Sequence, residues 1–186
     1  MNKLFVISGP AGVGKGTVIS ALRAAYPEIV VPVSATTRKP REGEVDGVHY
    51  HFITSEKFDE LIDADAFIEW AWVHKVHRYG TLKCEVEAAL QADKTVILEI
   101  DVQGASLVKK AMPAAHVIFL APPSWQELES RLRGRGSETE ESIARRLATA
   151  RAELDTASQW DSVVVNDSLE ATLAEMINLI GLGKDI

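Results

Sequence analysis

Hydrophobic positions along the chain alternate between short continuous runs and helically spaced sets. Continuous apolar runs at 3–8, 95–100 and 116–120 predict strands that are buried on both faces, which is typical of a parallel sheet. Short β-branched runs at 29–33 and 162–165 predict two further strands. The pattern therefore favours a mainly parallel sheet at the centre of the protein.

Helical spacing of apolar residues follows most of these runs. The first helix is predicted over Lys15–Ala25, where Val18, Ile19 and Leu22 share a face and Pro27 prevents continuation. Ser124 with Glu127 forms a capping-box pattern at the start of another helix. The other helices are expected at 104–111, 124–133, 138–157 and 169–180. This alternation predicts an α/β fold with helices on both faces of the sheet.

The stretch from 34 to 81 interrupts the alternation. It begins with a polar, turn-rich segment and continues with two strand-like segments, at 49–53 and 67–73, around a short helix at 56–64. Because its aromatic residues need a buried environment, we interpret it as an inserted mixed α/β lobe rather than a linker. The predicted organisation is one domain over 1–186, with a core (1–33 and 82–186) and this lobe (34–81).

Composition and charge limit the functions that a protein of this fold can have. The 186 residues include 20 Lys and Arg against 27 Asp and Glu, a net charge of −7 that argues against a nucleic-acid-coating protein. It still allows a locally positive pocket for a small anion. One cysteine, Cys84, excludes an internal disulfide framework. No run approaches the ~20 apolar residues that span a bilayer, so we expect a cytoplasmic protein without a membrane partner. For its oligomeric state, both a monomer and a homo-oligomer stay open.

A glycine-rich loop, GPAGVGKGT, joins the first predicted strand to the first helix. Phosphate oxygens need several convergent donors, and successive backbone N–H groups supply them where side chains are small. The helix start adds its positive dipole end, and a lysine directly after the third glycine supplies a cation. The residues of this loop that are expected to bind the nucleoside triphosphate are Gly9, Pro10, Ala11, Gly12, Val13, Gly14, Lys15, Gly16 and Thr17.

The loop departs from the usual pattern at one position. Gly16 follows Lys15 where a serine or threonine hydroxyl commonly binds Mg²⁺, and Thr17 comes one residue later. We therefore expect no confident protein ligand to the metal, with Mg²⁺ held mainly by nucleotide phosphates and water. The loop predicts a nucleoside triphosphate but leaves the phosphate acceptor open.

Further motifs identify the acceptor. In order they are SATTRKPREGEVDGVHYHF at 34–52, FIEW at 67–70, YGT at 79–81, IDVQG at 100–104, RLRGRG at 131–136, EESIARRL at 140–147 and VND at 165–167. Together with the glycine-rich loop, this order and spacing closely resembles the guanylate kinase family over nearly the whole chain. The resemblance implies a P-loop NTPase-type core, transfer of the γ-phosphate of ATP to GMP, Mg²⁺ as cofactor, and a role in purine nucleotide metabolism and GMP recycling.

The acceptor residues also make chemical sense for GMP. A dianionic phosphate needs fixed guanidinium groups, and Arg38 and Arg41 lie three apart in a turn-rich loop, with Tyr50 and Tyr79 as phenolic donors. Standing alone, two such arginines would more often belong to a solvated surface loop. By resemblance, all four residues are expected to bind GMP.

The guanine edge offers two donors and one acceptor. A carboxylate at Glu69 can accept from N1–H and N2–H₂, while hydroxyls at Ser34 and Thr81 can donate to O6. Adenine lacks both donors and would leave the carboxylate unpaired. A polar residue on the wet face of a strand is the alternative reading of Glu69. By resemblance, Asp101 completes the guanine side of the site.

A glycine-flanked arginine segment resembles the closing lid of the family, expected over about 124–157. Arg135 and Arg146, with Lys15 and Arg38, are the expected catalytic cations, while Arg131 and Asn166 are expected at the ATP. Phosphoryl transfer needs positioning and charge neutralisation rather than a strong base, which fits this arginine-rich set. Arg145 and Arg151 are better explained as an exposed helix face.

Two alternatives to this enzyme remain. Guanylate kinase-like scaffold modules bind without catalysis, but their phosphate loop is typically degraded, whereas Lys15 and the glycines are intact here. A kinase of another phosphate acceptor, such as a ribose phosphate, would not need Ser34, Glu69 and Thr81. Departures from the family pattern occur at Trp72, Lys75–Val76 and Glu99, and the histidine pairs 49/51 and 74/77 are expected on strands and the surface rather than at a metal.

Overall fold

A four-stranded, entirely parallel sheet forms the centre of the molecule, as the apolar runs predict. The computed structural model describes residues 3–73, 76–134 and 140–183. The strand order is β6 (Val96–Glu99), β1 (Leu4–Ser8), β7 (His116–Ala121) and β8 (Ser162–Val165). Every residue of β1 is buried, so the sheet is covered on both faces.

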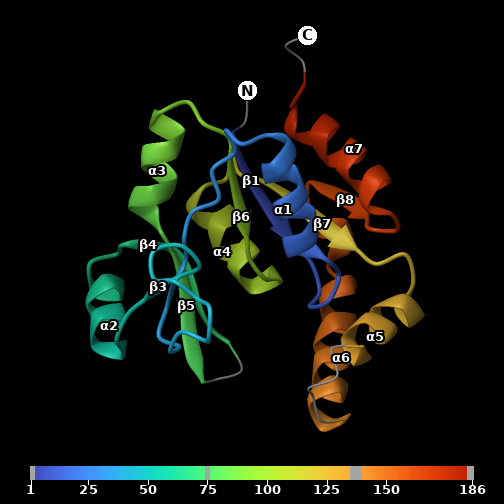
Figure 1. Cartoon of the computed structure of the whole chain (residues 1–186), viewed down its shortest axis with the longest axis horizontal. Helices are drawn as coiled ribbons and strands as arrows, with labels where there is room; N and C mark the ends of the chain where they lie inside the picture. Colours follow the sequence, from blue (N-terminus) through green and yellow to red (C-terminus); the bar gives the residue numbers. More distant parts are fainter. Residues whose placement is uncertain (1–2, 74–75, 135–139, 184–186) are drawn as a thin grey trace.

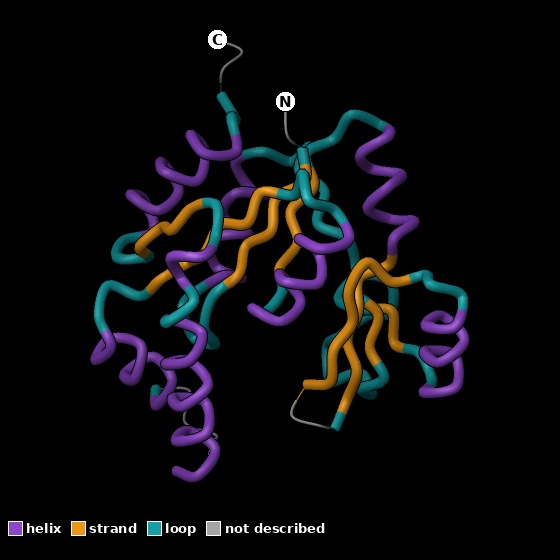
Figure 2. The backbone as a smooth tube through the Cα atoms, turned by 180° about the vertical axis from the view of Figure 1, so that it is seen from behind, coloured by secondary structure: helices purple, strands orange, loops and turns teal. Residues whose placement is uncertain are grey.

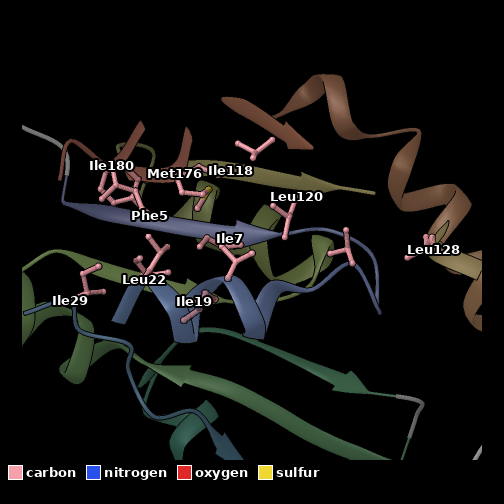
Figure 3. Packing of buried hydrophobic residues seen from close by; sticks show 14 of the residues in the cluster. Phe5, Ile7, Ile19, Leu22, Ile29, Ile118, Leu120, Leu128, Met176 and Ile180 are labelled. Carbon is pink, nitrogen blue, oxygen red and sulfur yellow. The ribbon is translucent and has the colours of Figure 1, made fainter. Parts of the chain in front are cut away.

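Helices cover the two faces of this core sheet (Figure 1). On one face, Phe5 and Ile7 of β1 pack with α1 (Lys15–Ala25) and α7 (Leu169–Ile180), as the close view in Figure 3 shows. On the other face, the intervening β1 residues Leu4 and Val6 pack with α3 (Lys83–Gln91) and α4 (Val102–Ala111). The predicted α/β architecture is confirmed.

A second sheet, which we call the inserted sheet (residues 35–82), lies to one side of the core. Its order is β3 (His51–Phe52), β2 (Ala35–Thr36), β5 (His77–Leu82) and β4 (Phe67–Val73), with parallel and antiparallel pairs. Phe58 of α2 (Ser55–Asp63) stacks on Phe67 with ring centroids 4.5 Å apart. Ile68 of β4 packs into the core cluster beneath α4 and thereby joins the two sheets.

A helical arm stands opposite the inserted sheet. It consists of α5 (Trp125–Arg133) and α6 (Glu140–Leu154), and the short 3₁₀ helix η1 (Ala157–Gln159) follows it. Both views of the backbone show the arm and the inserted sheet extending from the same end of the core, on opposite sides (Figures 1 and 2). Strands β1 and β7 finish at this end, where open α/β sheets bind their ligands.

Two local predictions from the sequence need correction. The expected strand at 29–33 is wrong: Val30 alone forms an isolated bridge, to Val96, and Pro32 supplies no N–H for a longer ladder. The hydrophobic pattern also missed β5 and α3. Strand β5 buries a charged residue, Arg78, and α3 buries only Val86 and Ala89, so neither element has a strong apolar period.

No helix in the described part of the chain is long and apolar enough to cross a membrane.

Candidate active site

The glycine-rich loop, here called the donor loop (residues 9–17), lies between β1 and α1 and is held tightly from behind. Gly9 has a φ of 136°, and a Cβ there would lie 2.2 Å from the carbonyl oxygen of Leu120 in β7. Gly14 has a φ of 102°, and a Cβ there would lie 2.5 Å from Nδ2 of Asn166. Only glycine satisfies both the backbone angle and the close approach at these two positions.

Lys15 places its cation across the donor loop. Its Nζ donates to the carbonyl oxygens of Gly9, at 2.6 Å, and Pro10, at 3.2 Å. Helix α1 begins at this lysine, and within the described contacts no side chain caps it at Gly14. The N–H groups of its first turn and the lysine ammonium therefore lie together at the end of β1, as a phosphate site requires.

Asn166 supports the donor loop through a buried hydrogen-bond chain. Its Nδ2 donates to the carbonyl oxygen of Val13 at 2.7 Å, and its Oδ1 accepts from the hydroxyl of Thr172 at 3.0 Å. Arg131 of α5 reaches the same carbonyl at 3.4 Å and the backbone oxygen of Asn166 at 3.5 Å. Both predicted ATP residues thus lie against the donor loop. Asn166 stabilises the loop at Val13, whether or not it also contacts adenine.

Glu69 is buried in the inserted sheet, with 7% of the residue exposed. Thr81, its cross-strand partner on β5, donates its hydroxyl to Glu69 Oε1 at 2.7 Å. Burial raises the pKa of this carboxyl to about 7, and the charge of Asp101 acts in the same direction. The wet-face interpretation of Glu69 is therefore excluded, and the side chain has the low-dielectric surroundings that make hydrogen-bond recognition selective.

The first turn of α4 brings Glu69 close to Asp101. Asp101 caps α4 and accepts from the N–H of Gly104 at 2.8 Å. A Cβ on Gly104 would lie 3.1 Å from Glu69 Oε2 and 3.4 Å from Asp101 Oδ1. The absence of a side chain at Gly104 thus lets both carboxylates lie close together at the first turn of α4.

Arg38 and its neighbours form a second cluster, at the edge of the inserted sheet. Arg38 Nε donates to the phenolic oxygen of Tyr79 at 3.1 Å, and the guanidinium carbon lies 5.4 Å from the ring centre of Tyr50. The two tyrosine rings meet edge to face, with centroids 5.6 Å apart. The structure therefore brings three of the four predicted phosphate residues into contact, while Arg41 is exposed on the adjoining loop.

Glu44 belongs to this cluster, although our sequence analysis gave it no role. Its carboxylate accepts from Nη1 and Nη2 of Arg38, both at 2.8 Å, and from the backbone N–H of Arg41 at 2.7 Å. The Arg38 pair lowers the pKa of Glu44 to about 2. Thr172 was missed as well, because a threonine inside a helix carries no local signal of a site, and Gly104 was named only as the end of the IDVQG motif without a role of its own.

The remaining predicted residues are placed as follows. Ser34 immediately precedes β2 and its carbonyl oxygen accepts from His51. Arg146 is half-buried in α6, and Arg135 lies outside the described residues. Of the histidines, 49, 51 and 77 lie in the inserted sheet and its loop, and His74 lies outside the described residues.

Carboxylates also approach the donor loop. A Cβ on Gly16 would lie 3.4 Å from Oε1 of Glu99, the last residue of β6. Burial raises the pKa of Glu153, on α6, to about 7, and the charge of Lys15 opposes this shift. Among the described residues no group of three His, Cys, Asp or Glu side chains is arranged to hold a metal ion.

Comparison with known proteins places this geometry in a family. The guanylate kinase family model matches residues 1–181. Guanylate kinase of Cutibacterium acnes is 53% identical over 177 residues, covering 95% of this chain and 89% of the relative. Guanylate kinase of Mycobacterium tuberculosis is 50% identical over 181 residues, covering 97% and 87%. The crystal structure of guanylate kinase from Anaplasma phagocytophilum superimposes with a TM-score of 0.76 at 31% identity, covering 96% of this chain and 84% of that one. The chain belongs to the guanylate kinase family.

Proposed function

We propose that this protein transfers the γ-phosphate of ATP to GMP and releases ADP and GDP, with the donor loop binding ATP and the inserted sheet binding GMP. Family membership over residues 1–181 supports the reaction. The observation that carries the choice of acceptor is the buried carboxylate of Glu69, hydrogen-bonded to Thr81 and close to the first turn of α4 at Gly104.

Base recognition follows from the hydrogen-bonding groups of Glu69 and its neighbours. The ionised carboxylate accepts from N1–H and N2–H₂ of guanine, and hydroxyls at Ser34 and Thr81 donate to O6. Asp101 lies beside this edge. Adenine would bury the same carboxylate without donors, which costs more than the loss of an ordinary contact.

The two charged ends of the reaction are held by different groups. Lys15 and the N–H groups around it neutralise the triphosphate, and Arg38, Arg41, Tyr50 and Tyr79 hold the acceptor phosphate. The attacking oxygen belongs to a phosphate whose second pKa is about 6, so it is already a nucleophile near neutral pH and needs no general base. Catalysis then consists of alignment and charge neutralisation.

Mg²⁺ fits this site as a partner of the nucleotide. It would neutralise charge on the triphosphate, and the carboxylate of Glu99 beside Gly16 is an oxygen donor near the donor loop. A single carboxylate suits an ion that keeps most of its ligands as phosphate and water. The small residue at 16 leaves room for the longer Glu99 arm.

The arm of α5 and α6 is proposed to act as a lid. It stands across from the inserted sheet and carries Arg131 and Arg146, and Arg135 follows α5 in the sequence. Closure over both nucleotides would add these guanidiniums to the phosphates and exclude water that would otherwise hydrolyse ATP.

A panel of acceptors tests the proposal. ADP release from ATP is measured with GMP, AMP, CMP, UMP and ribose 5-phosphate, and we expect turnover with GMP at least 100-fold above the others. Lys15→Met is expected to lower turnover about 1000-fold while leaving the melting temperature unchanged. Absence of turnover with every acceptor would favour a binding module, and equal turnover with ribose 5-phosphate would refute recognition of guanine.

A further inference from the structure

Hydrogen bonds inside the protein occupy most of the guanidinium of Arg38. A guanidinium has five N–H donors. Nε donates to Tyr79, Nη1 to Glu44 Oε2 and to the carbonyl oxygen of Lys39, both at 2.8 Å, and Nη2 to Glu44 Oε1 at 2.8 Å. Four of the five donors are thus engaged, and Glu44 occupies in bidentate fashion the Nη1–Nη2 edge that could take an oxyanion.

Glu44 is held in this position from two sides. The N–H of Arg41 donates to it at 2.7 Å, and its side chain is only 18% exposed, although most of the loop from 39 to 49 is exposed. Its low pKa keeps the carboxylate ionised at any pH at which the enzyme works. The contact is therefore an ion pair that stays charged until another anion replaces Glu44, rather than a chance surface contact.

A carboxylate on a guanidinium fork has the geometry that a phosphate would adopt there. Two anions cannot both make bidentate bonds to the same edge of Arg38, so the acceptor phosphate must either displace Glu44 or accept poorer contacts. A dianion gains more from Arg38 and the neighbouring Arg41 than a single carboxylate charge does, whereas a monoanion gains little.

We propose that Glu44 is a specificity-determining residue: an exchangeable internal carboxylate that occupies the acceptor-phosphate position on Arg38 until a phosphate dianion displaces it. This inference rests on the proposed function, because it takes Arg38 to be the phosphate ligand of GMP. The carboxylate weakens binding of every anion at this position, and weaker oxyanions are excluded by the competition.

Calorimetric binding of GMP, guanosine and sulfate to Glu44→Gln tests the exchange. The amide keeps the shape and an acceptor oxygen but loses the charge, so we expect GMP to bind about three- to tenfold more tightly. Sulfate should tighten at least as much as GMP. Guanosine has no phosphate and leaves Glu44 in place, so the affinity for guanosine should change less than twofold.

Glu42→Gln is the matched control, because it removes the same charge from an exposed position on the same loop. We expect less than a twofold change in GMP affinity for it. Glu44→Asp keeps the charge and shortens the arm, and should also tighten GMP, which provides a second variant if the first does not fold.

Unchanged or weaker GMP binding to a folded Glu44 variant would overturn the inference, because Glu44 would then support Arg38 rather than compete for it. Equal tightening of guanosine would overturn it too, since the effect would come from the loop and not from the phosphate. Turnover of GMP by the unaltered enzyme, measured on the same preparations, separates these results from a failure of the proposed function.

Discussion

The donor loop and the acceptor loop (residues 37–50) are both proposed to bind phosphate through cations, but they are built in opposite ways. The donor loop is made of backbone, pressed against Leu120 at Gly9 and against Asn166 at Gly14. The acceptor loop is made of side chains that pair with one another, Arg38 with Glu44 above all. Packing behind the first loop fixes its shape before ATP arrives, whereas on our proposal the second exchanges an internal partner for its ligand.

This difference matches the two ligands. A triphosphate offers many oxygens in a row, which a rigid series of N–H groups can meet without rearrangement. A nucleoside monophosphate offers one phosphate and one base, and the enzyme must recognise both together. Side chains that exchange partners make binding conditional on the correct charge, and a buried carboxylate makes it conditional on the correct base.

Alanine at one glycine of each loop should give the largest contrast. In Gly9→Ala the new Cβ would lie 2.2 Å from a backbone oxygen at positive φ, so we expect a loss of about 4 kcal/mol in unfolding free energy and over 100-fold in turnover. In Gly43→Ala, where φ is 82° and nothing lies within 4 Å, the loss should be about 1 kcal/mol. Urea unfolding and ADP release measure both.

Equal stability losses in these two variants would contradict the comparison, because the strain of a positive φ is common to both and only the packing differs. A Gly9→Ala enzyme with normal stability and normal KM for ATP would show that the donor loop can shift away from β7 without consequence.

The sequence reveals the donor loop better than the acceptor loop for the same physical reason. A loop that binds phosphate through its backbone needs glycines at several positions, and its lysine has a fixed place in the sequence. Residues 9–17 are therefore recognisable from the sequence alone. Acceptor residues could be named by resemblance, but the Arg38–Glu44 pair joins residues in an irregular loop, where no periodicity reports contacts.

Long-range contacts limited the prediction of the fold in a similar way. Burial of Arg78 in β5 depends on Asp59 and the Phe58 ring of α2, which are distant in sequence, so the strand appears polar. The Asn166–Thr172 pair is local, but its target, the carbonyl of Val13, is 153 positions away from Asn166. Continuous apolar strands such as β1 and β7 were predictable because their burial needs no particular partner.

Removal of the Glu69 charge should change the pH dependence of stability by up to about 3 kcal/mol. Burial raises the pKa of this carboxyl to about 7 in the folded protein, above its ordinary value of 4.5. The native state therefore holds a proton that the unfolded chain has lost, and stability falls as pH rises from 4.5 to 7. Glu69→Gln should flatten this fall in urea titrations between pH 5 and 8 without nucleotide.

Glu153 also lowers stability as pH rises, because burial raises its pKa as well. The unfolding free energy of Glu69→Gln will therefore still fall somewhat with pH. Glu87→Gln, at an exposed position on α3, is the control and should retain the slope of the unaltered protein. If unfolding free energy depends on pH in the same way in Glu69→Gln and in the unaltered protein, Glu69 is already ionised at pH 5. The contrast between a buried carboxylate for the base and exchangeable side chains for the phosphate would then be wrong.

The smallest expected effect tests whether the buried contacts behind the donor loop affect the KM for ATP without affecting the KM for GMP. Thr172→Val removes the hydroxyl that donates to Asn166 Oδ1 at 3.0 Å and preserves the shape, so unfolding free energy should fall by about 1 kcal/mol. The released Asn166 amide would hold the carbonyl of Val13 less firmly, which should raise KM for ATP about threefold and leave KM for GMP within error. Thr149→Val removes a hydroxyl that donates to the carbonyl oxygen of Arg145 within α6, and should change neither constant. If Thr172→Val lowers stability but leaves KM for ATP unchanged, the buried chain supports the fold without shaping the loop, and the rigidity of the donor side must come from its glycines and Leu120 alone.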